Sequence, residues 1–444
     1  MFRRKSANIE RGAAAPGNTL SLTVPATKTG HAVRLPRTFD SLRTPEYRWY
    51  LISSLGWFGA MQMQTLVRGY LVFQLTGSFA ALGTIALANS LPGLALTMVG
   101  GLVADRFRRK RVVQLGQTAS AVTALVLGLL ALAGILEFWH LLVSAAVQSV
   151  IMSLSMPSRQ SMLPEVVGME RFMNASALNT GGMQMMGLVA PAAGGFLLAG
   201  FGADWVFFLM TASYIFTVLM LFKVPDRNPQ MVQRMATVAA ARRRMSLSPR
   251  NLASGLGYVA KEPTVRVILG SSLLITLFAM PYQMMLPGFV SDVLDGDATM
   301  LGTLQSVGGI GALSGALFIA SSPSRGRGKM LLASALIAGG ALIVFSLSSV
   351  VWVTALAMVV IGVGQAMRQS LGQVLVQSYV LDEYRGRAMS VYLMQQNLVS
   401  LGTFFAGVLA SLVGPQFAIG GLAVSMIVVA CALYTVSPRL RQLD

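Results

Sequence analysis

The sequence predicts an all-α membrane protein with twelve transmembrane helices in two pseudo-symmetric six-helix halves. Of its 444 residues, 54% are apolar and only 11% are charged, whereas soluble proteins carry about 25% charged residues. Apolar runs of about 20 residues, each long enough to cross the bilayer core, recur along the chain. These runs are too long and too evenly apolar for barrel strands, so helices are expected.

Short polar connections separate most of the twelve runs. The expected spans are 49–74, 79–103, 112–134, 139–162, 174–200, 205–223, 266–290, 299–321, 330–349, 352–377, 387–412 and 416–437. A longer polar stretch at 225–263 is expected to be a cytoplasmic linker between a half at 49–224 and a half at 264–437. Residues 1–48 are expected to form a disordered basic cytoplasmic tail, and 438–444 a second cytoplasmic tail.

A weak internal repeat supports a duplication. The fourth span contains Arg159-Gln160-Ser161, and the tenth contains Arg368-Gln369-Ser370. Two six-helix halves joined by a polar linker are typical of secondary transporters, whose site lies at the interface between the halves.

The basic residues are distributed asymmetrically. Apart from Arg68 and Arg368, which lie within spans, the Lys and Arg residues fall in the tails, the linker, alternate loops or the span ends next to them, as Arg159 does. The other loops carry acids, among them Glu137, Asp204 and Asp297. Because cytoplasmic loops are enriched in Lys and Arg, we expect a multi-pass protein of the cell inner membrane with both termini cytoplasmic. The net charge of +18 then requires no nucleic-acid partner.

Sites of several other kinds are not expected. With one cysteine, Cys431, and two histidines, neither a disulfide framework nor a His/Cys metal site is expected. The stretch 325–329 contains Gly-Lys but lacks the rest of a P-loop. We therefore expect no enzyme activity, no cofactor and no metal. The expected partners are a small-molecule substrate and the lipid bilayer, and the chain is expected to be a monomer.

The most informative motif follows the second span. Residues 101–111 read Gly-Leu-Val-Ala-Asp-Arg-Phe-Arg-Arg-Lys-Arg. This resembles the Gly-x-Leu-Ala-Asp-Arg-x-Gly-Arg-Lys signature of the major facilitator superfamily, with Val103 and Arg108 as departures. A carboxylate here can accept hydrogen bonds from a helix N-terminus. The resemblance implies the major facilitator fold and a gating motif made of Gly101, Asp105, Arg106, Arg109 and Lys110.

Three further stretches narrow the resemblance within the superfamily. They are Leu66–Ser78, Pro157–Glu165 and Tyr384–Ser390. They resemble the branch that contains enterobactin exporters and macrolide-type efflux pumps.

The fifth span carries a second motif. Pro191, Gly194 and Gly195 resemble the Gly-Pro-x-x-Gly-Gly element of the superfamily's exporters, with Ala190 in place of the first glycine. Proline removes a helix hydrogen bond and glycine permits close packing, so the segment can bend against a neighbouring helix. The resemblance favours export over import.

Polar residues within spans are costly and are functional candidates. Arg68 and Arg368 either snorkel or bond backbone carbonyls, or they line a cavity that favours an anionic or hydrogen-bonding neutral substrate. Amides and aromatic rings extend this set, since amides facing lipid would be unfavourable. The candidates for the substrate cavity are Arg68, Arg368, Gln148, Gln365, Gln369, Tyr282, Gln283, Gln396 and Asn397.

Charged residues near the inner ends of the fourth and tenth spans are candidates for ion pairs at an inner gate. Arg159 is expected to snorkel or to pair with Glu165. The full set is Arg159, Glu165, Asp382, Glu383, Arg385 and Arg387. The bodies of the spans contain no Asp or Glu, so proton coupling through carboxylates at the helix ends and transport without protons both stay open.

These observations predict a secondary active transporter that exports a small amphiphilic molecule by alternating access. The expected substrate is siderophore-like and either anionic or neutral. The alternatives are a multidrug or macrolide-type efflux pump, a lysophospholipid transporter and a non-transporting sensor.

Overall fold

The computed structural model describes residues 40–225, 257, 262–322, 326–380 and 385–443. The expectations for the tail at 1–39 and for nearly all of the linker lie outside these residues. Within the described residues, ten helices are long and apolar enough to cross a membrane.

Within each of two groups, the helices follow one another along the chain with few residues between them. The first group comprises α1 (Pro45–Thr76), α2 (Phe79–Arg106), α3 (Arg109–Leu132), α4 (Phe138–Val167), α5 (Phe172–Phe201) and α6 (Ala203–Phe222). The second comprises α9 (Pro263–Ala279), α10 (Pro281–Asp292), α11 (Ala298–Ser321), α12 (Arg327–Leu347), α13 (Val351–Tyr379), α14 (Arg385–Val413) and α15 (Pro415–Val436). A short helix, η1 (Asp40–Arg43), precedes α1, and another, α16 (Pro438–Arg441), follows α15. Each expected span coincides with one helix or, at 266–290, with two.

Local sequence accounts for the turns. Gly77 ends α1 at a φ of +59°, a left-handed conformation that glycine adopts without strain. The Ser78 hydroxyl then accepts a hydrogen bond from the backbone N–H of Ala81 and caps α2. Asp297 caps α11 in the same way through the N–H of Met300, at 2.9 Å.

The seventh span differs from the expectation of one continuous helix. It is divided into α9 and α10 at Met280. Proline has no backbone N–H, so Pro281 cannot donate the next hydrogen bond of the helix. The hydrogen bonds of α9 therefore end with the N–H of Met280, which donates to the Thr276 carbonyl at 3.1 Å. The break places Tyr282 and Gln283 at the start of a separate helix.

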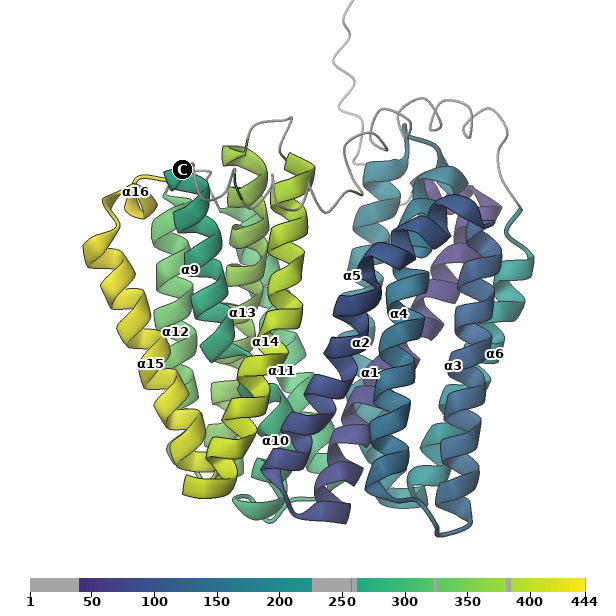
Figure 1. Cartoon of the computed structure of the whole chain (residues 1–444), viewed down its shortest axis with the longest axis horizontal. Coiled ribbons are helices and arrows are strands. Elements are labelled where there is room, and N and C mark those ends of the chain that lie inside the picture. Colours follow the sequence, from purple (N-terminus) through teal and green to yellow (C-terminus); the bar gives the residue numbers. More distant parts are fainter. Residues whose placement is uncertain (1–39, 226–256, 258–261, 323–325, 381–384, 444) are drawn as a thin grey trace, which may run out of the picture. The chain divides into compact units, whose positions relative to one another are not determined.

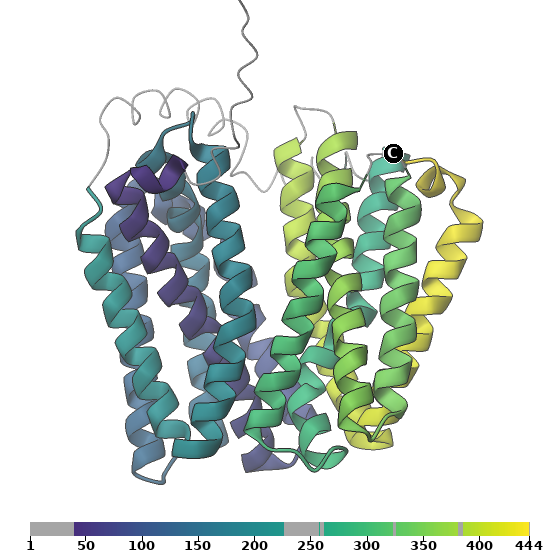
Figure 2. The ribbon, with the colours of Figure 1, turned by 180° about the vertical axis from the view of Figure 1, so that it is seen from behind.

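The helices pack as two groups. Contacts are extensive among α1–α6, notably between α2 and α4 and between α3 and α6, and among α9–α15, notably between α13 and its neighbours α11 and α12. The views from front and back both show the purple-to-teal and the green-to-yellow helices as separate bundles (Figure 1, Figure 2). The fold class expected from the sequence is therefore confirmed.

The two groups meet mainly along two pairs of helices, α5 with α11 and α2 with α14. A Cβ atom added to Gly195 of α5 would lie 2.3 Å from the Ala298 carbonyl oxygen, and one on Gly302 of α11 would lie 2.4 Å from that of Pro191. Such spacing leaves no room for a side chain, so the two backbones touch directly.

The contact between α2 and α14 has the same character. A Cβ atom on Gly83 would lie 2.9 Å from Cα of Phe404, and one on Gly407 would lie 2.5 Å from the Phe79 carbonyl oxygen. The Ser411 hydroxyl also accepts a hydrogen bond from the N–H of Ala80 at 3.0 Å. All these residues lie near the ends of their helices on the side of the molecule where Glu137, Asp204 and Asp297 lie, which we call the acidic end. The opposite end, with the basic turn at 106–111, is the basic end.

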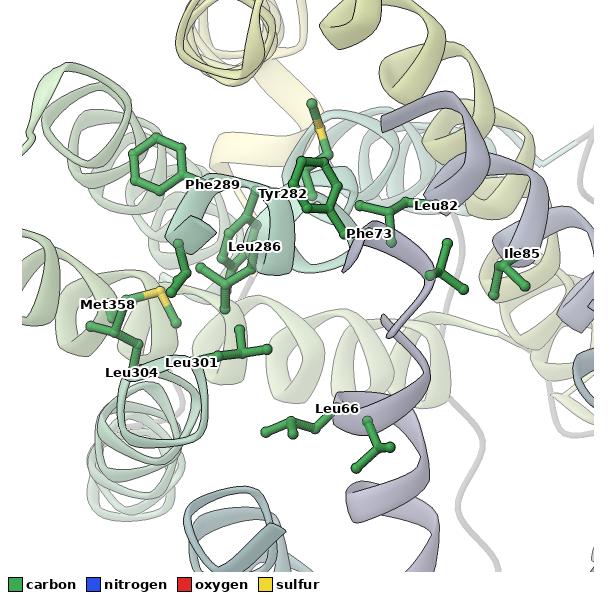
Figure 3. Packing of buried hydrophobic residues seen from close by; sticks show 14 of the residues in the cluster. Leu66, Phe73, Leu82, Ile85, Tyr282, Leu286, Phe289, Leu301, Leu304 and Met358 are labelled. Atoms are coloured by element: carbon green, nitrogen blue, oxygen red, sulfur yellow. The ribbon is translucent and has the colours of Figure 1, made fainter. Parts of the chain in front are cut away.

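An apolar cluster fills the space between these contacts. Side chains from α1, α2, α10, α11 and α13 gather in it (Figure 3). Its members include Leu66, Phe73, Leu82, Ile85, Tyr282, Leu286, Phe289, Leu301, Leu304 and Met358. Because both groups of helices contribute, the cluster joins them near the acidic end.

The glycine contacts predict a matched pair of effects on stability. Gly195→Ala places a methyl group against the backbone of α11. It is expected to lower the free energy of unfolding by about 1–3 kcal/mol, the usual range for overpacking. Gly200→Ala, on the same helix, has nothing within 4 Å of the added Cβ and is the control. The melting temperatures of the two purified variants are compared in one detergent. Equal melting temperatures would show that the α5–α11 contact does not restrain the fold.

Candidate functional site

Arg159 of α4 is buried and is bonded within the first group of helices. Its Nη1 donates to the Ser54 hydroxyl of α1 at 3.1 Å. Its guanidinium carbon lies 4.4 Å from the ring centroid of Trp57, a cation–π distance. The Tyr50 hydroxyl donates to the Arg159 carbonyl at 3.0 Å. Arg159 therefore ties α4 to α1.

Arg368 of α13 makes the corresponding contact in the second group. Its Nη1 donates to the Thr276 hydroxyl of α9, and Tyr392 of α14 lies nearby. The repeated Arg-Gln-Ser motif thus has a structural counterpart, since in each half the arginine bonds a hydroxyl on that half's first helix. Arg159 and Arg368 are 6% and 4% exposed, so neither guanidinium lies on an open surface.

A second set of polar contacts lies beside Arg368. The Ser272 hydroxyl of α9 donates to Gln395 Oε1 of α14 at 3.1 Å, and Gln395 Nε2 donates to the Leu269 carbonyl at 3.0 Å. The Tyr392 hydroxyl donates to the Gln369 carbonyl at 3.3 Å. These bonds fix α9, α13 and α14 to one another.

Several partners in these networks were not among the residues expected from the sequence. They are Tyr50, Ser54, Thr276 and Ser272. The position of an arginine in the middle of a span was the only signal that an acceptor lay nearby.

The amide candidates fall into two places. Gln283 of α10 donates through Nε2 to Oε1 of Gln365 of α13 at 3.1 Å, and Gln283 and Gln369 are exposed. Gln148 instead lies inside the first group, where its Oε1 accepts from the Ser120 hydroxyl of α3 at 3.2 Å. Tyr282 is part of the apolar cluster, with its ring edge-on to Phe345.

Arg68 does not share the surroundings of Gln283. It is 7% exposed and lies near Tyr214 of α6. In the described part of the chain, its Nε and Nη2 and the Tyr214 hydroxyl have no hydrogen-bond partner. Arg68 is thus directed into the first group of helices.

The basic turn is anchored at the basic end of the first group. Arg109 of α3 forms an ion pair with Glu165 of α4, and Lys110 donates to the Val224 carbonyl after α6 at 2.6 Å. Arg106 is exposed. The expected partner of Glu165 was Arg159, but the structure pairs this carboxylate with Arg109 and gives Arg159 the hydroxyl of Ser54.

Some candidates lie where the structure gives no side-chain description. These are Gly101, Asp105, Asp382, Glu383, Arg385, Arg387, Gln396 and Asn397. Among the described residues, no three His, Cys, Asp or Glu side chains gather as they would around a metal ion.

The exporter element occupies a defined place in this arrangement. Pro191 and Gly195 form the α5 side of the contact with α11, and a Cβ atom on Gly194 would lie 3.2 Å from Met63 of α1. The element therefore packs α5 both against α1 of its own half and against α11 of the other half.

The family comparison agrees with the fold. A family model described as a transmembrane secretion effector, MFS_3, matches residues 37–444. The chain belongs to this family of major facilitator transporters. Its members are membrane transporters, so the expectation that the chain is not an enzyme is confirmed.

Three curated relatives match this MFS_3 transporter over most of their length. The staphyloferrin A transporter of Staphylococcus aureus is 21% identical over 81% of this chain and 88% of its own. The multidrug efflux pump Tap of Mycolicibacterium fortuitum is 24% identical over 84% and 91%. The enterobactin exporter EntS of Escherichia coli is 24% identical over 81% and 84%.

A solved structure supports the same fold. The nucleoside transporter NupG superposes with a TM-score of 0.68 at 16% identity, and the match covers 88% of this chain and 99% of its own. At that identity the likeness concerns the fold alone.

The Arg368 contact predicts a loss of stability when its acceptor is removed. Thr276→Val keeps the side-chain shape but leaves the buried Arg368 guanidinium with one hydrogen bond fewer. The free energy of unfolding is expected to fall by about 1–3 kcal/mol. The control is Thr303→Val, because the exposed Thr303 hydroxyl bonds only its own helix, at Thr299. Thermal unfolding in detergent measures both variants. A loss for Thr303→Val as large as that for Thr276→Val would contradict the assignment.

Arg68 and Arg159 are expected to respond differently to the same substitution. Arg68→Met removes a buried guanidinium that has two unpartnered nitrogens within the described part of the chain, so the melting temperature is expected to stay the same or rise. Arg159→Met also removes the bond to Ser54 and the contact with Trp57, so its melting temperature is expected to fall. A fall of equal size in both variants would show that Arg68 has a structural role like that of Arg159.

Proposed function

We propose that this protein is a secondary transporter that exports a small amphiphilic, siderophore-like molecule, anionic or neutral, across the cell inner membrane by alternating access. The family description as a secretion effector supports the direction. Of the three relatives described above, the staphyloferrin A transporter and EntS are named after a siderophore. EntS and Tap are named as an exporter and an efflux pump.

The observation that carries the proposal is the contact between α5 and α11. The exporter element seals the two halves at the acidic end through Pro191, Gly195 and Gly302. Toward the basic end the same face of α5 continues through Gln184 and Thr180, both exposed. In a transporter that is open toward the basic end, the two halves must touch at the acidic end, and polar residues must be exposed beyond that contact.

Charge sets the direction of this opening. Basic loops face the cytoplasm in most membrane proteins, so the basic end and both termini are assigned to the cytoplasm. The substrate then enters from the cytoplasm, and export follows when the acidic-end contact opens. We infer an inner-membrane location from the same charge distribution.

Multidrug efflux is the second candidate, on one specific ground. Tap is as similar to this chain as EntS is, at 24% identity in both cases. The two functions differ in whether the substrate is an endogenous metabolite or a foreign compound.

The test compares metabolites in the spent medium and in the cells of a deletion strain and its complemented parent. The strains are grown in iron-poor and in iron-rich medium, because siderophore export differs between these conditions. We expect one metabolite to be lost from the medium and to accumulate in cells that lack the gene. A second complementation with Gly195→Leu, which blocks the α5–α11 contact, is expected to reproduce the deletion.

Matching profiles in all strains would overturn export of an endogenous molecule. Drug susceptibility of the same strains then tests the second candidate, for which the deletion strain is expected to be more sensitive to amphiphilic compounds.

A further inference from the structure

A row of glutamines follows one face of α13. Gln365, Gln369 and Gln373 are spaced four residues apart, and Gln377 continues the spacing one turn further, although its side chain is not described. Successive members are displaced by about 6 Å along the helix and by about 40° around it. We call Gln365, Gln369 and Gln373 the glutamine row. Gln373 was not among the residues expected from the sequence.

The neighbours of α13 show which way the row faces. On one side, a Cβ atom on Gly372 would meet Tyr392 of α14 and Ser272 of α9. Behind, one on Gly364 would meet Ser334 and Ala338 of α12. Nearer the acidic end, one on Gly362 would lie 2.1 Å from the Gly308 carbonyl of α11.

The row begins beyond the point where α11 touches α13, since Gly362 is only about 20° around the helix from Gln369 but about 10 Å nearer the acidic end. Gln369 lies about 140° around the helix from Gly364, so it points away from α12. Gln369 and Gln373 are exposed, and exposure to lipid in a spanning helix would leave their amides unsatisfied. Gln365 is bonded to Gln283 of α10, a helix that also contacts α1 and α2 of the other half. The row therefore faces the other half of the transporter.

The row has free hydrogen-bonding capacity. Gln365 Nε2 is buried and has no hydrogen-bond partner in the described part of the chain. Among the same residues, no bond is formed by the side-chain amides of Gln369 and Gln373. An amide offers two donors and two acceptor positions without net charge.

Charge at this face argues for an uncharged ligand. Among the described residues, the guanidinium that adjoins the row along the chain is that of Arg368, which is directed to Thr276 and is 4% exposed. No carboxylate lies in the body of a span. Among the described side chains, a ligand with a charged group would meet neutral amides here, and desolvating its charge against them is unfavourable.

From this placement we propose that the glutamine row, together with Gln283, is the substrate-binding surface and selects an uncharged, elongated molecule with repeated amide, hydroxamate or hydroxyl groups. The inference rests on the proposed export function and narrows its substrate class from anionic or neutral to neutral. Arg68, Arg159 and Arg368 then hold helices together and do not contact the substrate.

A binding experiment tests this without requiring transport. The full-length protein is placed in nanodiscs of phosphatidylethanolamine and phosphatidylglycerol. The probes are three forms of one linear trihydroxamate, desferrioxamine B: the N-acetyl form, which is uncharged, the N-succinyl form, which carries a carboxylate, and the free amine, which carries an ammonium group. Microscale thermophoresis gives a Kd for each form.

We expect the N-acetyl form to bind at least about tenfold more tightly than either charged form, since a charged end finds no partner. The double variant Gln369→Met/Gln373→Met is expected to weaken binding of the N-acetyl form by about tenfold or more. Gln114→Met is the matched control, because Gln114 lies on α3, whose helix contacts are with α2, α4 and α6. Its Kd is expected to stay within about twofold of the unmodified protein. Melting temperatures confirm that all variants are folded.

Three results would overturn the inference: equal or tighter binding of the succinyl form, an unchanged Kd in the double variant, or binding of none of the three forms. The metabolite comparison described above is run in parallel with the double variant as a further complementation. A gene-dependent metabolite whose export survives the double substitution refutes the glutamine row alone. Absence of any gene-dependent metabolite refutes the export function, while the Kd values still decide what the row binds.

Discussion

The direct backbone contact of α5 with α11, and of α2 with α14, is the constraint on which the rest of the structure depends. Each contact requires glycine on both helices, Gly195 with Gly302 and Gly83 with Gly407. Dispersion forces at such short range are strong but fall off steeply with separation. The two halves are therefore held firmly near the acidic end, and their facing polar side chains further along are left without a protein partner from the other half among the described residues.

A membrane interior with arginines and no carboxylates needs neutral acceptors. Serine and threonine hydroxyls fill this role for Arg159 and Arg368, at equivalent places in the two halves. A buried carboxylate would add a second desolvation cost to that of the guanidinium. The repeated pairing also shows that the duplication of the chain extends to individual contacts, since α4 bonds α1 as α13 bonds α9.

The helices could be predicted from the sequence because apolar length alone determines what crosses a bilayer. The break at Met280 could not be predicted from the proline that follows it. Prolines also lie inside the unbroken helices α2, α4 and α5, at Pro92, Pro157 and Pro191. The exporter element was found from its motif, but its neighbour α11 was not. Arg68 and Gln148 were candidates for lining a cavity, yet both are directed into the first half, because the rotation of a helix about its axis is set by packing that the pattern does not contain. Glu165 follows Arg159 by six residues, about 240° around the helix, so the residue close in sequence was not the one close in space.

The division of the seventh span affects how the chain enters the membrane. With 17 residues in α9 and 12 in α10, each piece is shorter than the roughly 20 residues that a crossing needs. Together they form a single apolar segment of 30 residues, which the insertion machinery must accept as one. In the folded chain, α10 is held by contacts with α1, α2 and α14. The last of these partners to be synthesised is α14, which begins more than a hundred residues after the kink.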